Sequence, residues 1–370
     1  MQIENVYILM NDGVFRRGKI DFCETINTIE CSEEGFANAA YYLIPGLIDI
    51  HTHGAVRGDF SDGSAEEMRE MGVYYAKNGV TSFLATTMTY SEEKLEAAMK
   101  TIGGYERPEN GATCLGINME GPFLSYEKRG AHLPEALLPP DIKIFDRLNE
   151  ISGGKIRLIS LAPELDGAMD FIREVSQVCK VSVAHTAAGY DIAIKAFGAG
   201  ATHVTHLYNA MPPFMHRDPG VIGAARDANA FVELICDGVH SHPSVVRATF
   251  AMFEGRICMI SDSIRSAGLP DGKYESGGMP VIVENGKAVL ENGTIAGSNI
   301  SLMQGVRCAV NFGIPLAKAV MGATAVNARA LGMEDSVGVL KPGAASDMVL
   351  LDKELNIVEV YIHGEKLDLS

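Results

Sequence analysis

The sequence predicts an α/β fold: a (β/α)8 barrel of the TIM type, with a small β-sandwich domain formed by both chain ends. From about residue 47 onward, eight short apolar runs alternate with segments of helical period. Strand-then-helix units in that number suit a closed parallel barrel. The first run ends in histidines, whereas a doubly wound sheet, the rival fold, more often carries a glycine-rich phosphate turn there.

Eight candidate strands cover residues 47–53, 80–87, 114–120, 156–163, 181–186, 202–209, 231–240 and 257–263. Helical patterns lie between several of them. Ser64 followed by Glu67 is typical of a capping box and predicts a helix that runs to about Lys77. Residues 166–179, 189–198 and 243–253 have the same helical character.

The two chain ends, residues 1–44 and 336–370, fit this alternation poorly. Both contain short β-like pieces with turn signals, Asn-Asp-Gly at 11–13 and Lys-Pro-Gly at 341–343. Residues 346–352 are typical of a buried strand. We therefore expect the ends to pair into one small β domain beside a catalytic barrel over residues 45–335.

Composition limits the kinds of partner. A chain of 370 residues with 47% apolar and 21% charged residues has ample core for a globular enzyme. The net charge of −16 argues against nucleic acid and anionic membranes as partners. We expect no signal peptide, and no apolar run approaches the roughly 20 residues that span a bilayer. Seven scattered cysteines without a CxxC spacing favour a reduced, cytoplasmic setting.

Polar residues stand repeatedly at the predicted strand ends, where a barrel carries its catalytic groups. Alternation along a strand places His51 with His53 on one face, and Val204 with His206. Imidazoles and carboxylates that converge at a barrel mouth form a metal-ligand set that suits zinc, iron or nickel. The residues concerned, in chain order, are His51, His53, Glu120, His185, His206 and Asp262.

A bound ion would activate water, and Asp262 could take a proton from that water and pass it to the leaving group. A single strand histidine is more often a hydrogen-bonded structural residue than a ligand. We expect that role for His203, His242 and His363.

Several motifs carry a resemblance to a known family. Residues 45–54 (PGLIDIHTHG) resemble the opening of the amidohydrolase superfamily. Within it, the chain resembles the N-acetylglucosamine-6-phosphate deacetylase family over essentially its whole length. The motifs are residues 119–123 (MEGPF), 184–186 (AHT), 205–211 (THLYNAM), 237–240 (DGVH), 261–263 (SDS) and 268–274 (GLPDGKY).

The resemblance implies a metal-dependent amide hydrolase that removes acetate from N-acetylglucosamine 6-phosphate. It implies a principal divalent ion, zinc or iron, on Glu120, His185 and His206, with a second ion possible at His51 and His53. The resemblance therefore implies one or two ions per subunit. Asp262 corresponds to the acid/base of the family.

The resemblance also implies the substrate contacts and the assembly. His132 corresponds to the histidine that hydrogen-bonds the substrate near the scissile carbonyl. Arg217 and His240 correspond to residues that reach the phosphate across the interface of a homodimer, and an arginine fork suits a phosphate. The remaining contacts are Ala131, Asn209 and Ala210.

Other functions remain open at this point. Within the enzyme class the substrate could be the galactosamine epimer, or an N-acylated amine without phosphate. A non-catalytic scaffold on the same fold is a further alternative, although all six positions of the predicted metal and acid/base set are filled. The fourth predicted strand has no lysine to carboxylate, which counts against a cyclic-amide hydrolase, and residues 54–60 are less glycine-rich than the commoner family pattern.

Overall fold

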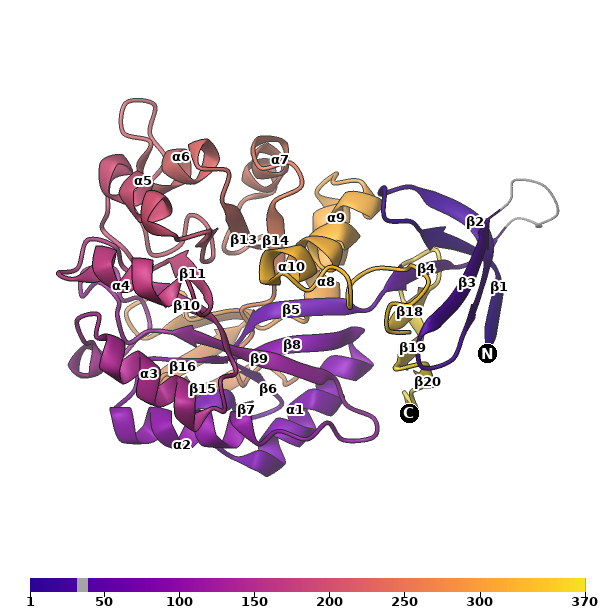
Figure 1. The fold of residues 1–370 in the computed structure, drawn as a ribbon, viewed down its shortest axis with the longest axis horizontal. Helices are drawn as coiled ribbons and strands as arrows, with labels where there is room; N and C mark the ends of the chain where they lie inside the picture. Colours follow the sequence, from indigo (N-terminus) through magenta and orange to yellow (C-terminus); the bar gives the residue numbers. More distant parts are fainter. Residues whose placement is uncertain (32–38, 370) are drawn as a thin grey trace.

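The computed structural model of the chain describes residues 1–31 and 39–369. Its largest sheet has eight parallel strands that lie side by side in chain order (Figure 1). They are β5 (Leu47–Thr52), β8 (Val80–Thr87), β9 (Thr113–Glu120), β10 (Ile156–Leu161), β11 (Lys180–Val183), β12 (His203–Val204), β13 (Phe231–Ile235) and β14 (Ile257–Ile260).

Helices follow the strands and pack on the outside of the sheet (Figure 1). The predicted (β/α)8 barrel is thereby confirmed. Ser64 caps the first helix by accepting a hydrogen bond from the backbone N–H of Glu67 at 3.3 Å, which is one half of the predicted capping box. The helices are α1 (Ala65–Lys77), α2 (Glu92–Gly103), α3 (Ile142–Ile151), α4 (Ala168–Val175), α5 (Tyr190–Ala199), α6 (Gly220–Asp227), α7 (Pro243–Met252), α8 (Leu302–Asn311), α9 (Leu316–Gly322) and α10 (Ala325–Leu331).

The barrel closes between β14 and β5 with the help of a side chain. Asn327 of α10 donates hydrogen bonds from Nδ2 to the carbonyl oxygens of Ile48 and Met259, at 2.6 and 2.9 Å. Just beyond the strands, the backbone N–H of Asp262 donates to the carbonyl of His51 at 2.9 Å. These bonds hold the last strand beside the first, so residues that follow β14 meet residues at the end of β5.

Both chain ends form one mixed seven-stranded sheet, in the order β20-β19-β18-β4-β1-β2-β3. Phe22 of β2 packs against Tyr361 of β19 with ring centroids 5.3 Å apart, although three strands lie between theirs in the sheet. The sheet therefore curls around its own core, as expected for a small sandwich. Its strands are β1 (Gln2–Leu9), β2 (Phe15–Phe22), β3 (Ile26–Cys31), β4 (Tyr42–Pro45), β18 (Met348–Leu351), β19 (Ile357–Ile362) and β20 (Glu365–Lys366).

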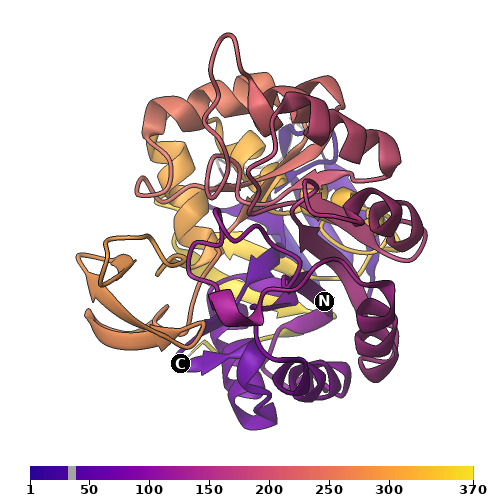
Figure 2. The same cartoon turned by 90° about the vertical axis from the view of Figure 1, so that its left-hand side faces the viewer.

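A three-stranded antiparallel sheet follows β14 and was not predicted. It consists of β15 (Gly272–Ser276), β16 (Met279–Glu284) and β17 (Lys287–Leu290), and it lies beside the barrel (Figure 2). Burial alternates along β16, where Val281 and Val283 are buried and Ile282 is exposed. Strands of this kind are exposed on one face, so they lack the continuous apolar run that predicts a buried barrel strand. A short ladder, β6 (Gly54–Ala55) with β7 (Gly58–Asp59), follows β5.

Within the described residues, every helix is too short or too polar to cross a bilayer.

Candidate metal centre and active site

The strands are shorter than predicted, and several site residues lie just after them. β11 ends at Val183, β12 at Val204 and β14 at Ile260. His185, His206 and Asp262 then adopt positive φ values of 41°, 26° and 50°. A non-glycine residue in this region costs about 1–3 kcal/mol and occurs most often at functional sites. The predicted shared face of Val204 and His206 is therefore wrong, because the regular alternation stops at Val204.

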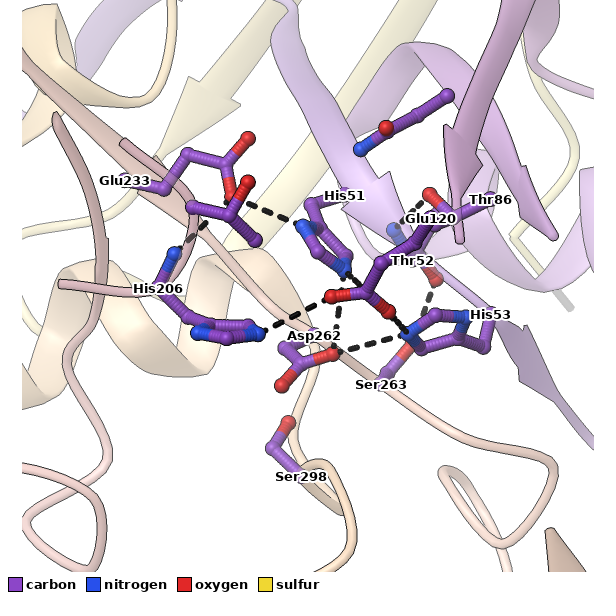
Figure 3. A network of polar contacts seen from close by, with 12 residues as sticks. His51, Thr52, His53, Thr86, Glu120, His206, Glu233, Asp262, Ser263 and Ser298 are labelled. Atoms are coloured by element: carbon purple, nitrogen blue, oxygen red, sulfur yellow. Dashed lines mark hydrogen bonds and ion pairs between the residues drawn. The ribbon is translucent and has the colours of Figure 1, made fainter. Parts of the chain in front are cut away.

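Glu120, the last residue of β9, lies at the centre of a buried polar cluster (Figure 3). Its Oε2 lies 3.5 Å from Nε2 of His51 and 3.2 Å from Nε2 of His53. Its Oε1 lies 3.3 Å from Nε2 of His185 and 3.0 Å from Nε2 of His206. The structure thus brings the predicted ligands together in two halves that share Glu120. We call them the His51 half (His51, His53, Glu120) and the His185 half (Glu120, His185, His206).

Hydrogen bonds at the far side of two rings determine which nitrogen faces the cluster. Nδ1 of His51 lies 2.8 Å from Oε2 of Glu233, and Nδ1 of His185 lies 2.8 Å from the carbonyl oxygen of Lys128. Both partners are acceptors, so each Nδ1 carries the proton and donates. In the neutral rings, Nε2 then has a free lone pair directed at the cluster, as a metal ligand requires.

The donor set of each half fits a divalent cation. The free lone pairs on Nε2 of His51 and His185 face carboxylate oxygens of Glu120 at 3.5 and 3.3 Å. Lone pairs in such contact repel one another unless a proton or a cation lies between them. In each half the potential ligand atoms lie within 4.8 Å of one another. Imidazole nitrogens and one shared carboxylate are suitable ligands for zinc or iron.

Asp262 lies beside the His51 half. Its Oδ1 is 3.2 Å from Nε2 of His53 and 3.6 Å from Nε2 of His51. Burial opposes the charge on Asp262, but the hydrogen bond from His53 and the charge of His51 outweigh it and lower the pKa to about 2. Burial also opposes the charge on His53, whereas contacts with Asp262 and Glu120 raise its pKa to about 9. Asp262 is therefore an anion at neutral pH and can accept a proton.

His132 presents a hydrogen-bond donor next to Glu120. Burial lowers the pKa of His132 to about 4, so the ring is neutral at pH 7. The backbone N–H of Thr89 donates to its Nδ1 at 3.2 Å, which leaves the ring proton on Nε2. That Nε2 lies 3.4 Å from Oε2 of Glu120. The ring can therefore donate to a carbonyl oxygen bound above the cluster.

A cavity of about 480 Å³ opens above the cluster. Ser276 of β15 and the segment that follows β17 form part of its wall, so the unpredicted sheet contributes to the site. Of the predicted substrate contacts, Ala131, Asn209, Ala210 and His240 line the cavity. Nδ1 of His240 is 2.7 Å from Oδ2 of Asp237, which holds the ring in place.

Arg217 is the one predicted contact that the structure does not place in this cavity. It lies instead in an outer groove with Tyr190, Asp191 and Asp218. Within a single chain, Arg217 is therefore separate from the rest of the predicted substrate site.

Sequence reasoning missed Glu233 and Thr89. Glu233 is a charged residue in the otherwise apolar strand Phe-Val-Glu-Leu-Ile, a signal that could have revealed it. Thr89 contacts Nδ1 of His132 through both its backbone N–H and its hydroxyl, at 3.2 and 2.9 Å, but a threonine after an apolar run is too common to mark a site. The three histidines expected to be structural lie outside the cluster: His203 stacks on Phe231, His242 caps α7 and the backbone N–H of His363 donates to Asp347.

Eight parallel strands with a buried histidine–carboxylate cluster at their ends define a barrel protein with a metal-hydrolase type of site. Residues 42–367 match the family model described as "Amidohydrolase family". The N-acetylglucosamine-6-phosphate deacetylase of Bacillus subtilis (strain 168) is 37% identical over 371 residues, which cover 98% of this chain and 92% of that protein. The N-acetylgalactosamine-6-phosphate deacetylase of Escherichia coli O157:H7 is 36% identical over 330 residues, 88% of each chain.

Solved structures agree with these relatives. A mutant N-acetylglucosamine-6-phosphate deacetylase from Mycobacterium smegmatis, in complex with N-acetylglucosamine 6-phosphate, superposes with a TM-score of 0.92 at 31% identity, covering 99% of this chain and 98% of that one. The deacetylase from Thermotoga maritima gives a TM-score of 0.91 at 30% identity, with both chains fully covered. The chain belongs to the amidohydrolase family and, within it, to the family of the N-acetylglucosamine-6-phosphate deacetylases.

Proposed function

We propose that this protein hydrolyses the acetamide of N-acetylglucosamine 6-phosphate, giving acetate and glucosamine 6-phosphate. The observation that carries the proposal is Glu120 at the cavity floor, surrounded by four imidazoles, with Asp262 and His132 within reach of the same point. The substrate follows from the family, whose members named above act on this sugar phosphate or on its galactosamine epimer.

An amide is a poor electrophile with a poor leaving group, so hydrolysis needs a polarised carbonyl, an activated water and a protonated amine. A divalent ion, when bound, supplies Lewis acidity that activates water and polarises the carbonyl. His132 donates from Nε2 to the carbonyl oxygen as negative charge develops on it. Asp262 accepts a proton from the attacking water and passes it to the amide nitrogen as the C–N bond breaks.

We propose zinc or iron as the native ion. The principal ion binds the His185 half, and the His51 half holds a second. Support comes from the donor set, in which Glu120 offers one oxygen to each half. Elemental analysis of the purified protein would settle both identity and number. A preparation that contains no metal and cannot be reconstituted would favour the scaffold alternative.

We further propose that the substrate is positioned by Ala131, Asn209, Ala210 and His240, with Arg217 contributed by a second subunit of a homodimer. Arg217 lies outside the cavity of its own chain, in an exposed loop that also carries Phe214 and Met215, which are 48% and 53% exposed. That placement fits a residue that acts across an interface. A cytoplasmic location remains part of the proposal, supported by seven free cysteines.

Acetate release measured side by side on three compounds tests the substrate. These are N-acetylglucosamine 6-phosphate, N-acetylgalactosamine 6-phosphate and unphosphorylated N-acetylglucosamine. We expect the highest kcat/KM on the first. Preference for the second would assign the galacto epimer, and preference for the free sugar would refute the phosphate roles of Arg217 and His240.

A further inference from the structure

Glu233 is a buried carboxylate for which the proposed reaction has no use. It lies in β13, is 0% exposed, and pairs in register with Cys258 of β14. Its Oε2 accepts hydrogen bonds from Nδ1 of His51 at 2.8 Å and from the backbone N–H of His206 at 3.2 Å (Figure 3). A carboxylate is costly to bury, and Oε1 has no partner among the described residues. Its bonded oxygen is directed at groups of the metal centre.

The two bonds have different consequences. The N–H of His206 belongs to the backbone and can only donate, so it fixes the position of the Glu233 oxygen. That oxygen can only accept, so it obliges His51 to carry its proton on Nδ1. In the neutral ring that binds metal, Nε2 of His51 is then the nitrogen without a proton, and it faces Glu120 and His53 at 3.5 and 3.3 Å.

We propose that Glu233 is a positioning residue for metal binding, which fixes the ring orientation and tautomer of His51 so that the His51 half can hold an ion. This inference rests on the metal centre proposed above. Among the described residues, the rings of the His185 half have no carboxylate in this role: His185 donates to a backbone carbonyl, and Nδ1 of His206 has no partner. Glu233 touches that half only at the backbone N–H of His206, so its effect on ring orientation and tautomer is confined to the His51 half.

The substitution Glu233→Gln tests the tautomer argument with little change of shape. An amide can turn either its oxygen or its NH2 group toward His51, so it no longer dictates which ring nitrogen carries the proton. We expect the zinc affinity of the His51 half to fall by about 10- to 100-fold, as for other residues that orient a ligand. The affinity of the His185 half should stay within about threefold of that of the unmutated protein, since its one bond to Glu233 comes from the backbone N–H of His206, which a glutamine oxygen can still accept, and not from a ligand atom.

Zinc bound per chain is measured against free zinc in chelator-buffered solutions, with thermal unfolding as a check on folding. Cys258→Ala is the matched control, because it changes the strand next to Glu233 at an equally buried position, and in the described part of the chain Cys258 forms no side-chain hydrogen bond to a ligand residue. It should bind zinc like the unmutated protein. A comparable loss in this control would reduce Glu233 to a packing residue and overturn the proposal.

A double-mutant cycle asks whether Glu233 acts through His51. In a His51→Ala background, Glu233→Gln should have no further effect on zinc binding. The same fold-loss with and without His51, or an unchanged affinity in the single variant, overturns the proposal. If the unmutated protein binds no zinc or iron at all, the metal centre itself fails, which is a different result from a metal-binding protein that is indifferent to Glu233.

A measurement on the unmutated chain covers the case in which Glu233→Gln does not fold. With ¹⁵N-labelled histidine, the zinc-loaded protein should show a ring whose Nδ1 is protonated and whose Nε2 is bound to metal. Loss of these signals in His51→Ala assigns them. A His51 ring bound through Nδ1 would be inconsistent with a proton fixed there by Glu233 and would overturn the proposal.

Discussion

The two halves of the ligand cluster share Glu120. They differ in how far their imidazoles are exposed to the cavity and in which groups hydrogen-bond the Nδ1 atoms of those rings. His185 and His206 both line the cavity, whereas of the two imidazoles in the His51 half only His53 does so and His51 is 0% exposed. His51 is held by the carboxylate of Glu233, while His185 is held by a backbone carbonyl. The His185 half thus opens to the cavity through both of its imidazoles, and the His51 half opens through His53 alone, next to Asp262.

Removal of the shared ligand should have the largest effect. In Glu120→Gln both halves lose an anionic oxygen, so we expect metal content to fall close to zero and turnover to fall by about four orders of magnitude or more. Elemental analysis and an acetate-release assay measure the two effects. Glu254→Gln, which changes an exposed carboxylate, serves as control. A variant of Glu120 that keeps its metal would show that the halves do not depend on a common ligand.

Asp262→Asn separates proton transfer from metal binding. The amide cannot accept the proton, so kcat should fall by about 10²- to 10⁴-fold. The His185 half should keep its ion, because the atoms that Asp262 contacts belong to His51 and His53. Single-turnover kinetics with metal analysis of the same samples decide this. Activity near that of the unmutated protein would mean that another group is the base.

Single histidine substitutions test which half is essential. His185→Ala should remove the principal ion and abolish measurable turnover, whereas His51→Ala should keep one ion and lose about 10- to 100-fold in kcat/KM. The two variants are compared at the same concentration of free zinc, with the zinc bound per chain measured for each. The reverse ranking, or equal losses, would contradict the asymmetry between the halves.

The smallest expected effect, counted per pH unit, is the change of zinc affinity of the His51 half with pH. In the metal-free protein the pKa of His53 is raised to about 9, so below that pH a proton must leave before Nε2 can bind an ion. Burial opposes the charge on His51 too, but Glu120 and Glu233 outweigh it and raise the pKa of His51. The zinc affinity of the His51 half should therefore fall by about tenfold or more per pH unit as the pH drops below 9. Calorimetric titration in buffers of different ionisation enthalpy measures the proton released. An affinity that is constant between pH 7 and 9 would show that His53 is already neutral in that range.

The barrel and most of the cluster were predictable from sequence. Residues such as Glu120 and His185 stand at the ends of short apolar runs, where a polar side chain has no role in packing and is conspicuous. Glu233 has a similar signal, but the predicted strand extended over residues 231–240, which put Glu233 near its start and far from the end where catalytic groups are expected. The observed strand ends at Ile235, two residues after Glu233.

The backbone at His206 and the sheet β15–β17 were not predicted correctly, and both errors have the same cause. Prediction by alternation assumes extended backbone, and it failed at His206, where φ is 26°. It also gave no account of β15–β17, which supply part of the cavity wall. Long-range contacts determine both features, and a periodic pattern records only local burial.

The sequence by itself determined the fold class, the residue types of the ligand set and their order along the chain, since burial and periodicity are written into local composition. The tertiary structure decided which oxygen of Glu120 meets which imidazole, and that Glu233 and the carbonyl of Lys128 orient the rings. It also placed Arg217 outside its own chain's cavity. The physical reason is that hydrogen-bond direction and ligand geometry depend on positions fixed to fractions of an ångström by packing between distant segments.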